Sequence, residues 1–399
     1  MGAGDTLSAD AVRVYRRAMG ENHSFVIYAD DDLVVSKREH VSPHFKPEWN
    51  APLFENFDFI TGACAVYVTQ PDLAGIEANS GWMARVVRKA LASSPVAPVH
   101  VPAMLHHRRA RPQPVLPLQT VALDAALPSV SIIIPTRNRV DLLRTCLAGL
   151  AKTRYPQFDI IVVDNGSDDP ETLDFLAALD PSRHRVLRHD GPFNYSALNN
   201  RAISQANGDL ICLLNNDIEI LDPDWLAVMA TSAIRPDVGA VGARLLYPDG
   251  RIQHAGVVIG VGNAAGHAHR FLQPDETGYF SRHNLPQFVS AVTAACLVVM
   301  RERFFAVGML NETDFPVAFN DVDLCLRLNA RGWQSFYEPR ATLVHHESVS
   351  RGHDLDAVGA ARFASELAAL QRKWHTDQII DPYHHPNLSR ASERFALAL

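Results

Sequence analysis

The stretch Leu210-Ile-Cys-Leu-Leu-Asn-Asn-Asp217 decides the fold. Five apolar or sulfur-bearing residues lead directly into three polar ones, and the segment lies between Gly208 and Asp222-Pro223. A short apolar run bounded by turn residues is typical of a strand that is buried on both faces. Ligands of open parallel sheets bind at the carboxyl ends of strands. The polar residues therefore offer oxygen ligands to Mg²⁺ or Mn²⁺, although Asn and Asp are also ordinary turn residues.

Two earlier segments follow the same pattern. The apolar run at 130–134 precedes Pro135–Arg139, and the run at 159–163 precedes Asp164–Asp169. Residues 142–150, 171–179 and 196–206 have the character of helices between these strands, and a short strand is expected near 186–187. This alternation predicts an α/β fold with a mixed, mostly parallel sheet. The three strand ends should then lie together on one edge.

Length and composition limit the classes of function. The chain has 399 residues, of which 47% are hydrophobic and 20% charged, as expected for one large or two ordinary globular domains. A net charge of -7 gives no general attraction for nucleic acid or anionic lipid. The five cysteines form no CxxC pair, which favours a reducing compartment. With no apolar signal region near the N-terminus and no long apolar run, we expect a cytoplasmic protein that is at most peripheral to a membrane.

The chain divides into two blocks of unequal content. We expect a partial domain at 1–110, a proline-rich linker at 111–128, the main α/β domain at 129–352, and a helix with a tail at 353–399. The first block repeats features of the second: Asp30–Asp32 matches Asn215–Asp217, and His106-His107 matches His345-His346. Where the second block has Asn320-Asp321, the first has Ser80-Gly81. The first block is therefore expected to be degenerate and without a base.

The second block carries acids and histidines that suit transfer chemistry. Asp164 and Asp217 follow strands, Asp321 and Asp323 start a helix, and His345-His346 follows a late strand. Two acids and a histidine suit a cation that holds a diphosphate, and a separate carboxylate suits deprotonation of a hydroxyl. An Asx turn, a helix cap and a core histidine explain the same residues equally well, so the residues alone leave both interpretations open.

Seven motifs in one order resemble the family 2 glycosyltransferases, which have the GT-A fold. The resemblance covers roughly 129–352, with a familiar tail to about 390, and the tail is similar to that of members that build O-antigen or other surface glycans. The first block resembles the rear part of a second such domain. The motifs are Val130-Ser-Ile-Ile-Ile-Pro-Thr-Arg-Asn, Ile161-Val-Val-Asp-Asn-Gly-Ser-Asp, Phe193-Asn-Tyr-Ser-Ala-Leu-Asn-Asn-Arg, Leu214-Asn-Asn-Asp, Asp224-Trp, Ala318-Phe-Asn-Asp-Val-Asp-Leu-Cys-Leu-Arg and His345-His-Glu-Ser-Val-Ser-Arg-Gly.

The resemblance implies a role for each matching residue. Asp321 would be the base that deprotonates the acceptor hydroxyl. Asp217 would be the metal ligand of a DxD-like motif whose first acid is replaced by Asn, and either His345 or His346 would complete the metal site. The nucleotide would contact Pro135, Thr136, Arg137, Asn138, Asp164, Asn200, Arg201 and Asn216, and the acceptor side would include Asn320, Asp323 and His254.

The implied activity is an inverting transfer of a sugar. The donor would be a nucleotide-diphosphate sugar, the acceptor a glycan or lipid-linked hydroxyl in surface-polysaccharide synthesis, and the cofactor Mg²⁺ or Mn²⁺. A non-catalytic protein that binds nucleotide sugars or glycans is the alternative. A nucleotidyltransferase is less favoured, because the loop after the first strand of the second block lacks the glycines of a phosphate-binding loop.

Overall fold

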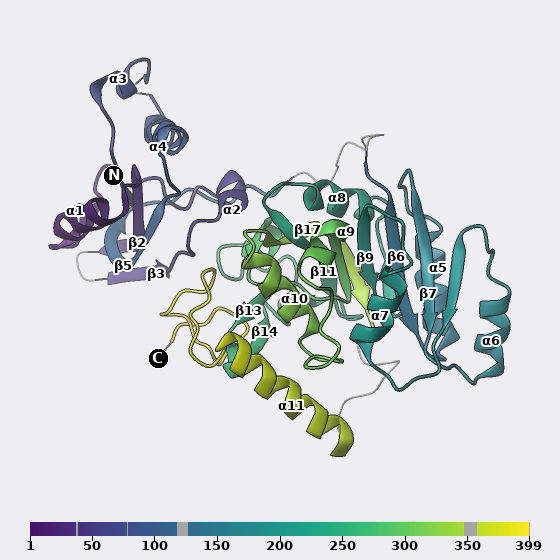
Figure 1. The fold of residues 1–399 in the computed structure, drawn as a ribbon. Helices are drawn as coiled ribbons and strands as arrows, with labels where there is room; N and C mark the ends of the chain where they lie inside the picture. Colours follow the sequence, from purple (N-terminus) through teal and green to yellow (C-terminus); the bar gives the residue numbers. More distant parts are fainter. Residues whose placement is uncertain (37–38, 78, 118–126, 347–356, 399) are drawn as a thin grey trace. The chain divides into compact units, whose positions relative to one another are not determined.

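The computed structural model describes residues 1–36, 39–77, 79–117, 127–346 and 357–398, which form two compact units (Figure 1). The first unit comprises Met1–Leu116, Pro382–Ser389 and Leu397–Leu399, and the second comprises Pro117–Asp381 and Arg390–Ala396. The division falls within the predicted linker, part of which (118–126) lies outside the described residues, as does the motif segment 347–352. The predicted tail is divided between the two units: residues 382–389 belong to the first unit and residues 390–396 to the second.

The second unit is built on a mixed sheet in the order β10-β17-β11-β16-β9-β6-β7-β8, with β12 beside β11 and β15 beside β17. The α/β class is as predicted. Parallel pairing is confined to β9-β6-β7-β8 and to β11–β17, while β16 is antiparallel to both of its neighbours. The strands are β6 (Val130–Thr136), β7 (Phe158–Asp164), β8 (His184–Arg188), β9 (Leu210–Leu214), β10 (Ile218–Ile220), β11 (Val238–Leu246), β12 (Ile252–His254), β15 (Gln287–Val289), β16 (Cys296–Met300) and β17 (Gln334–His345), with a separate pair β13 (Val257–Ile259) and β14 (Ala265–His267).

Strands β6 and β9 are buried along their whole length, which explains their uninterrupted apolar sequences. The apolar run at 289–300 does not form one continuous strand. Regular pairing stops after β15 and resumes at β16. Between them, Thr293, Ala294 and Ala295 line a cavity. Hydrophobicity alone did not reveal that this backbone is used to build a cavity wall.

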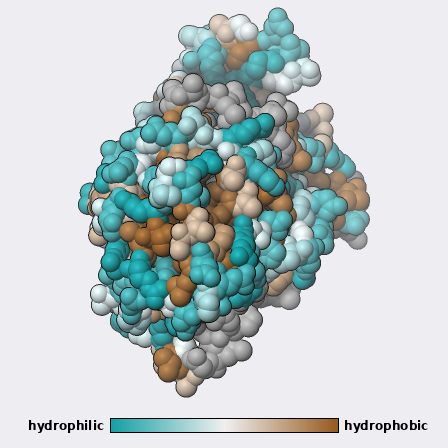
Figure 2. All heavy atoms as spheres, turned by 90° about the vertical axis from the view of Figure 1, so that its right-hand side faces the viewer, coloured by the Kyte–Doolittle hydropathy of each residue, from teal (hydrophilic) through white to brown (hydrophobic). Residues whose placement is uncertain are grey.

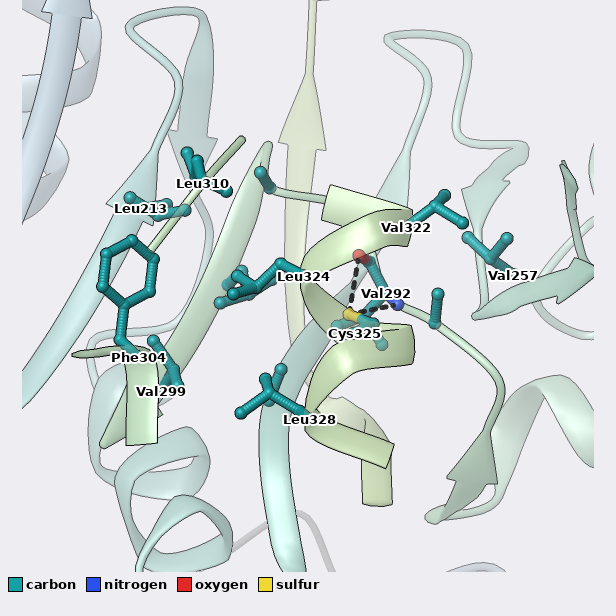
Figure 3. Close-up of a cluster of buried hydrophobic side chains, with 14 of the residues drawn as sticks. Leu213, Val257, Val292, Val299, Phe304, Leu310, Val322, Leu324, Cys325 and Leu328 are labelled. Atoms are coloured by element: carbon teal, nitrogen blue, oxygen red, sulfur yellow. Dashed lines mark hydrogen bonds between the residues drawn. The ribbon is translucent and has the colours of Figure 1, made fainter. Parts of the chain in front are cut away.

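Helices cover the sheet with amphipathic faces. Helix α10 buries Val322, Leu324 and Leu328 among apolar side chains of the core, as Figure 3 shows. In the same helix, the Cys325 thiol donates to the carbonyl of Val292 and accepts from its N–H, which fixes the helix against the cavity wall. The helices are α5 (Val140–Leu150), α6 (Pro170–Ala177), α7 (Tyr195–Ile203), α8 (Trp225–Ala233), α9 (Arg301–Ala306), α10 (Asn320–Asn329), α11 (Ala357–Trp374), and the 3-10 turns η1 (Val261–Asn263) and η2 (Arg282–Asn284).

The first unit contains a smaller sheet in the order β1-β5-β2-β3, with β4 paired to β2. Strand β2 continues through Asp30–Asp32 to Ser36, although these residues are acidic. In the apolar segment 59–68, only Cys64–Val66 forms a strand, β4. The elements are β1 (Thr6–Leu7), α1 (Ala11–Asn22), β2 (Val26–Ser36), β3 (Glu39–His44), α2 (Ala51–Asn56), β4 (Cys64–Val66), α3 (Gln70–Leu73), α4 (Trp82–Ser93) and β5 (Val99–Arg108).

The two sheets share one pattern of strand pairing. The pairs β1–β5, β2–β3 and β2–β4 are antiparallel and β2–β5 is parallel. In the second unit β10–β17, β11–β12 and β11–β16 are antiparallel and β11–β17 is parallel. Both parallel pairs shift register beside a proline, Pro102 or Pro339. Asp30–Asp32 therefore corresponds to the end of β11 and not to Asn215–Asp217, which corrects that part of the expected repeat.

One outer face of the second unit carries apolar side chains within a polar surround (Figure 2). The side that carries α6 includes a hollow between α5 and α6, with Leu147, Phe175 and Leu179 in its wall.

Within the described residues, none of the helices combines the length and apolar content needed to cross a bilayer.

Candidate active site

Three strand ends meet on one edge of the second unit's sheet, as predicted, because β6 lies between β9 and β7. The Asn216 side chain, in the loop after β9, donates from Nδ2 to Oγ1 of Thr136 at 3.0 Å. The Asn165 N–H donates to the Thr136 carbonyl at 2.8 Å. The buried Asp164 accepts from the N–H of Ser167 and from Nη1 of Arg188, at 3.0 and 2.6 Å. Asn216 and Asp164 are thus fixed at the edge where a nucleotide was predicted.

Asp217, in the loop after β9, lies beside His345, the last residue of β17. The distance from His345 Nε2 to Asp217 Oδ1 is 3.2 Å, and this carboxylate oxygen is buried without a hydrogen-bond partner among the described residues. His345 Nδ1 lies 2.7 Å from Oε1 of Gln253. Because the amide oxygen can only accept, Nδ1 carries the proton, and a neutral His345 then has its lone pair on Nε2. This is the orientation in which a histidine and an acid bind a divalent cation.

His346 lies elsewhere, which separates the two candidate histidines. Its Nε2 is 3.1 Å from Oε2 of Glu219 on β10, and both side chains are partly exposed. Its backbone N–H donates to the carbonyl of Asp217. Of the two, only His345 faces the Asp217 carboxylate.

A polar cavity of about 180 Å³ opens beside this pair, and Asp321 forms part of its wall. Asp321 Oδ2 accepts from the N–H of Ala294 at 2.9 Å, and Oδ1 accepts from the N–H of Val322 at 2.8 Å. Burial raises the pKa of Asp321 above its ordinary value, and these hydrogen bonds only partly oppose the rise. The other residues of the cavity wall are Tyr195, Asn215, Gln253, His267, Thr293, Ala294, Ala295, Val317, Asn320 and His345.

The three predicted acceptor-side residues have different surroundings. Asn320 lines the cavity and donates to the carbonyl of Val317. Asp323 does not line it: this fully buried carboxylate faces α11, where it contacts Lys373 Nζ at 2.7 Å and Trp374 Nε1 at 2.9 Å. His254 lies behind the wall, with its Nδ1 2.8 Å from Nδ1 of His267.

Two predicted nucleotide contacts serve mainly to hold loops together. The buried Asn200 bonds the backbone of Leu310 through both Nδ2 and Oδ1. Asn138 bonds the 167–169 loop through its backbone N–H and both side-chain polar atoms. Of the remaining three, Pro135 is buried within β6, Arg137 is exposed, and Arg201 Nη1 lies 3.0 Å from His189 Nδ1.

Several residues of the site were assigned no individual role from sequence, although Asn215 belongs to the predicted metal-binding loop. Tyr195 and Asn215 lie in motifs of the resemblance, and their hydroxyl and amide are 3.4 Å apart. Gln253 and His267 come from a glycine-rich segment without a recognisable motif. Loss of hydration lowers the pKa of His267 to about 4, so this ring is neutral at neutral pH. Nothing in the local sequence around Gln253 indicates that it orients His345.

Comparison with known proteins gives a family match over part of the second unit. Residues 131–292 match the model of the family described as Glycosyl transferase family 2. The matched segment includes the three strand ends and Asp217, and it stops before Asp321 and His345.

Three curated relatives extend the comparison. The uncharacterized protein y4gI of Sinorhizobium fredii is 40% identical over 94% of this chain and 46% of its own length. The O-antigen biosynthesis protein RfbC of Myxococcus xanthus is 34% identical over 98% of this chain and 33% of its own length. The N-acetylglucosaminyl-diphospho-decaprenol L-rhamnosyltransferase of Mycobacterium tuberculosis is 28% identical over 57% of this chain and 79% of its own length. The chain thus spans less than half the length of the first two.

Proposed function

We propose that the protein transfers a sugar from a nucleotide-diphosphate donor to a hydroxyl of a glycan or lipid-linked acceptor, with inversion at the anomeric carbon. The observation that carries the proposal is that Asp321, His345 and Asn215 lie in the wall of the same cavity, next to Asp217. The names of the Myxococcus and Mycobacterium relatives support surface-glycan synthesis and a lipid-linked acceptor.

Asp321 would act as the general base. Its two backbone hydrogen bonds hold the carboxylate in the cavity wall, and its raised pKa makes it a stronger base than an exposed aspartate. The acceptor hydroxyl gives its proton to this carboxylate as its oxygen forms the bond to the anomeric carbon. The bond from that carbon to the nucleoside diphosphate breaks on the opposite face.

The residues around Asp217 fit a divalent cation. The buried oxygen without a partner on Asp217 and the Nε2 lone pair of His345 would hold it, and Gln253 keeps the histidine in the required tautomer. When bound, Mg²⁺ or Mn²⁺ would neutralise charge on the diphosphate. One carboxylate and one imidazole leave most coordination positions of the ion open, so the diphosphate and water would complete them.

The test is a screen of nucleotide-diphosphate sugars with Mn²⁺, read as thermal stabilisation of the protein and as release of the nucleoside diphosphate. We expect one donor to stabilise the wild-type protein and to be turned over. Asp321→Asn should keep the stabilisation and lose turnover by about 100-fold or more. Turnover by Asp321→Asn at the wild-type rate would refute the assigned base.

The same screen addresses the alternative of a non-catalytic binding protein. That alternative predicts stabilisation by the nucleotide with no release of nucleoside diphosphate in the presence of any acceptor. Asn320→Ala is a useful companion variant because its side chain lies in the same wall without a carboxylate. It should retain more turnover than Asp321→Asn.

A further inference from the structure

A second group of potential ligands lies in the first unit, and it does not depend on the proposed transfer reaction. Asp32, His40 and His107 come from the neighbouring strands β2, β3 and β5. Each offers one ligand atom, and the three atoms lie within 4.8 Å of one another. Sheet register creates this grouping, since Asp32 is the parallel partner of His107, and His40 pairs with Val34 two residues further along β2.

The contacts within the group are close and directed. His40 Nδ1 is 3.0 Å from Oδ2 of Asp32, and His107 Nδ1 is 2.9 Å from Oδ1. The two rings are perpendicular, with their centroids 4.6 Å apart. One carboxylate therefore faces two imidazole nitrogens, each on its own oxygen. Separations near 3 Å are only a few tenths of an ångström shorter than the roughly 3.3–3.6 Å expected between adjacent ligands of a tetrahedral ion with bonds of about 2.0–2.2 Å.

The three side chains of this group are partly exposed, unlike those of a fully buried structural cluster. The side chain of His40 is 39% exposed, that of His107 22% and that of Asp32 10%. An ion can reach these atoms from solution, and water can complete its coordination. The carboxylate is held on the sheet while the histidines form the open side.

A buried group on the same strand provides a contrast. Asp30 lies 3.0 Å from Nε2 of both His100 and His385. However, Nδ1 of His385 accepts the N–H of Asn387 at 3.0 Å, so a neutral His385 carries its proton on Nε2. That nitrogen can donate to Asp30 but has no lone pair for a metal. The buried group is therefore a clamp between side chains, and of these two groups the one at Asp32 is better suited to an ion.

The geometry points to a transition-metal site at Asp32, His40 and His107, with Zn²⁺ as the ion of best fit. Two imidazoles and one carboxylate favour Zn²⁺ over Mg²⁺, which prefers oxygen ligands. Binding displaces the protons that the histidines donate to Asp32. The site thus differs in chemistry from the oxygen-rich Asn215–Asp217 loop of the second unit.

The test is calorimetric titration of the full chain with ZnCl₂ near neutral pH, in the presence of excess Mg²⁺. We expect saturable Zn²⁺ binding that His40→Gln and His107→Gln each weaken by at least about tenfold, and that Asp32→Asn also weakens. The exposed control His23→Asn should bind as the wild type does. Circular dichroism confirms that each variant is folded.

Two results would overturn the site. The first is wild-type Zn²⁺ affinity in the double variant His40→Gln/His107→Gln, and the second is displacement of Zn²⁺ by Mg²⁺. A further measurement uses the unmodified chain, so its result does not depend on whether the variants fold. Zn²⁺ should protect His40 and His107, but not His23, from carbethoxylation mapped by mass spectrometry. Equal labelling of all three with and without Zn²⁺ would also refute the proposal.

Discussion

His345 and His346 are neighbours in sequence but have different partners. Strand β17 ends at His345, whose ring faces Asp217 and Gln253, whereas the ring of His346 reaches Glu219. The sequence predicted a histidine at this position but could not distinguish the two, because the choice depends on Gln253, which is 92 residues away. A motif identifies the residue types at a site, while long-range contacts decide which of them is oriented for binding.

This difference leads to a paired prediction. His345→Ala should raise the Mn²⁺ concentration needed for half-maximal turnover by about tenfold or more, because it removes a ligand that Gln253 has already oriented. His346→Ala, which removes only a partly exposed contact with Glu219, should change this concentration by less than about twofold. Turnover titrated with MnCl₂ gives both values, and the reverse ranking would contradict the assignment.

The raised pKa of Asp321 predicts how activity depends on pH. A general base acts in its deprotonated form, so kcat/KM should fall as pH decreases through the pKa of Asp321. Since burial raises this pKa, the fall should begin at a higher pH than for an exposed aspartate. A pH series of kcat/KM measures the midpoint. A midpoint at or below the ordinary value of an aspartate would show that this carboxylate is not the base.

At the scale of elements, helix α10 carries two acids with separate tasks. Asp321 lies in its first turn and faces the cavity, while Asp323 is fully buried against α11 and also contacts Arg327 at 2.8 Å. The acidic first turn was visible in the sequence. The partners of Asp323 were not, because Lys373 and Trp374 lie about fifty residues further along the chain. Its predicted place on the acceptor side therefore remains without a contact that supports it.

Substitution of these two acids should give opposite results. Asp323→Asn should lower the free energy of unfolding by about 2 kcal/mol, because it weakens charged hydrogen bonds to Lys373 and Arg327, and the folded fraction should keep its turnover. Asp321→Asn should lose turnover with a smaller loss of stability, because removing a charge that burial disfavours offsets part of the cost of leaving one backbone N–H without its acceptor. Urea unfolding and turnover per folded molecule measure both. Loss of turnover in folded Asp323→Asn would place this residue in the reaction.

A comparison of the individual strands and helices shows why some of them were predicted and others were not. Strands β6, β7 and β9 and helices α5 and α10 follow their hydrophobic periodicity. Strand β2 does not, because its acids are stabilised by distant residues: Lys46 lies 2.7 Å from Asp31, and His100 lies 3.0 Å from Asp30. Local patterns detect apolar burial, but not polar burial that depends on partners from other strands.

At the scale of the whole molecule, the shared order of strands was predictable but its alignment was not. The acids of the first unit resemble the Asn215–Asp217 loop in residue type, yet sheet pairing places them on the counterpart of β11. The parallel half β9-β6-β7-β8 has no counterpart among the described strands of the first unit. The relation of this unit to a glycosyltransferase domain remains a prediction that rests on the common pairing of its strands.

The segment Pro382–Ser389 belongs to the first unit, and its His385 contacts Asp30 of β2. Burial alone would raise the pKa of Asp30, but hydrogen bonds from His100 and His385 outweigh it and lower that pKa. Burial would lower the pKa of His100, and its contacts with Asp30 and Glu48 outweigh this and raise it. A lowered carboxylate pKa stabilises the fold above the acid range, and a raised histidine pKa stabilises it below the unfolded histidine pKa. The clamp should therefore be strongest in the window from roughly pH 4 to pH 6.5.

Replacement of His385 should release this segment. His385→Ala should speed amide hydrogen exchange in Val26–Ser36 and Val99–Arg108, because Asp30 loses one of its two imidazole partners and Phe45 loses a ring that stacks on it at 4.9 Å. Asn387→Ala is the matched control, since Asn387 contacts His385 through its backbone N–H and its side chain is exposed. Hydrogen exchange measured by mass spectrometry near pH 6 compares the two. Because Asp30 is fully buried in β2, exchange that is equally slow in both variants would mean that His100 alone is sufficient to hold its charge.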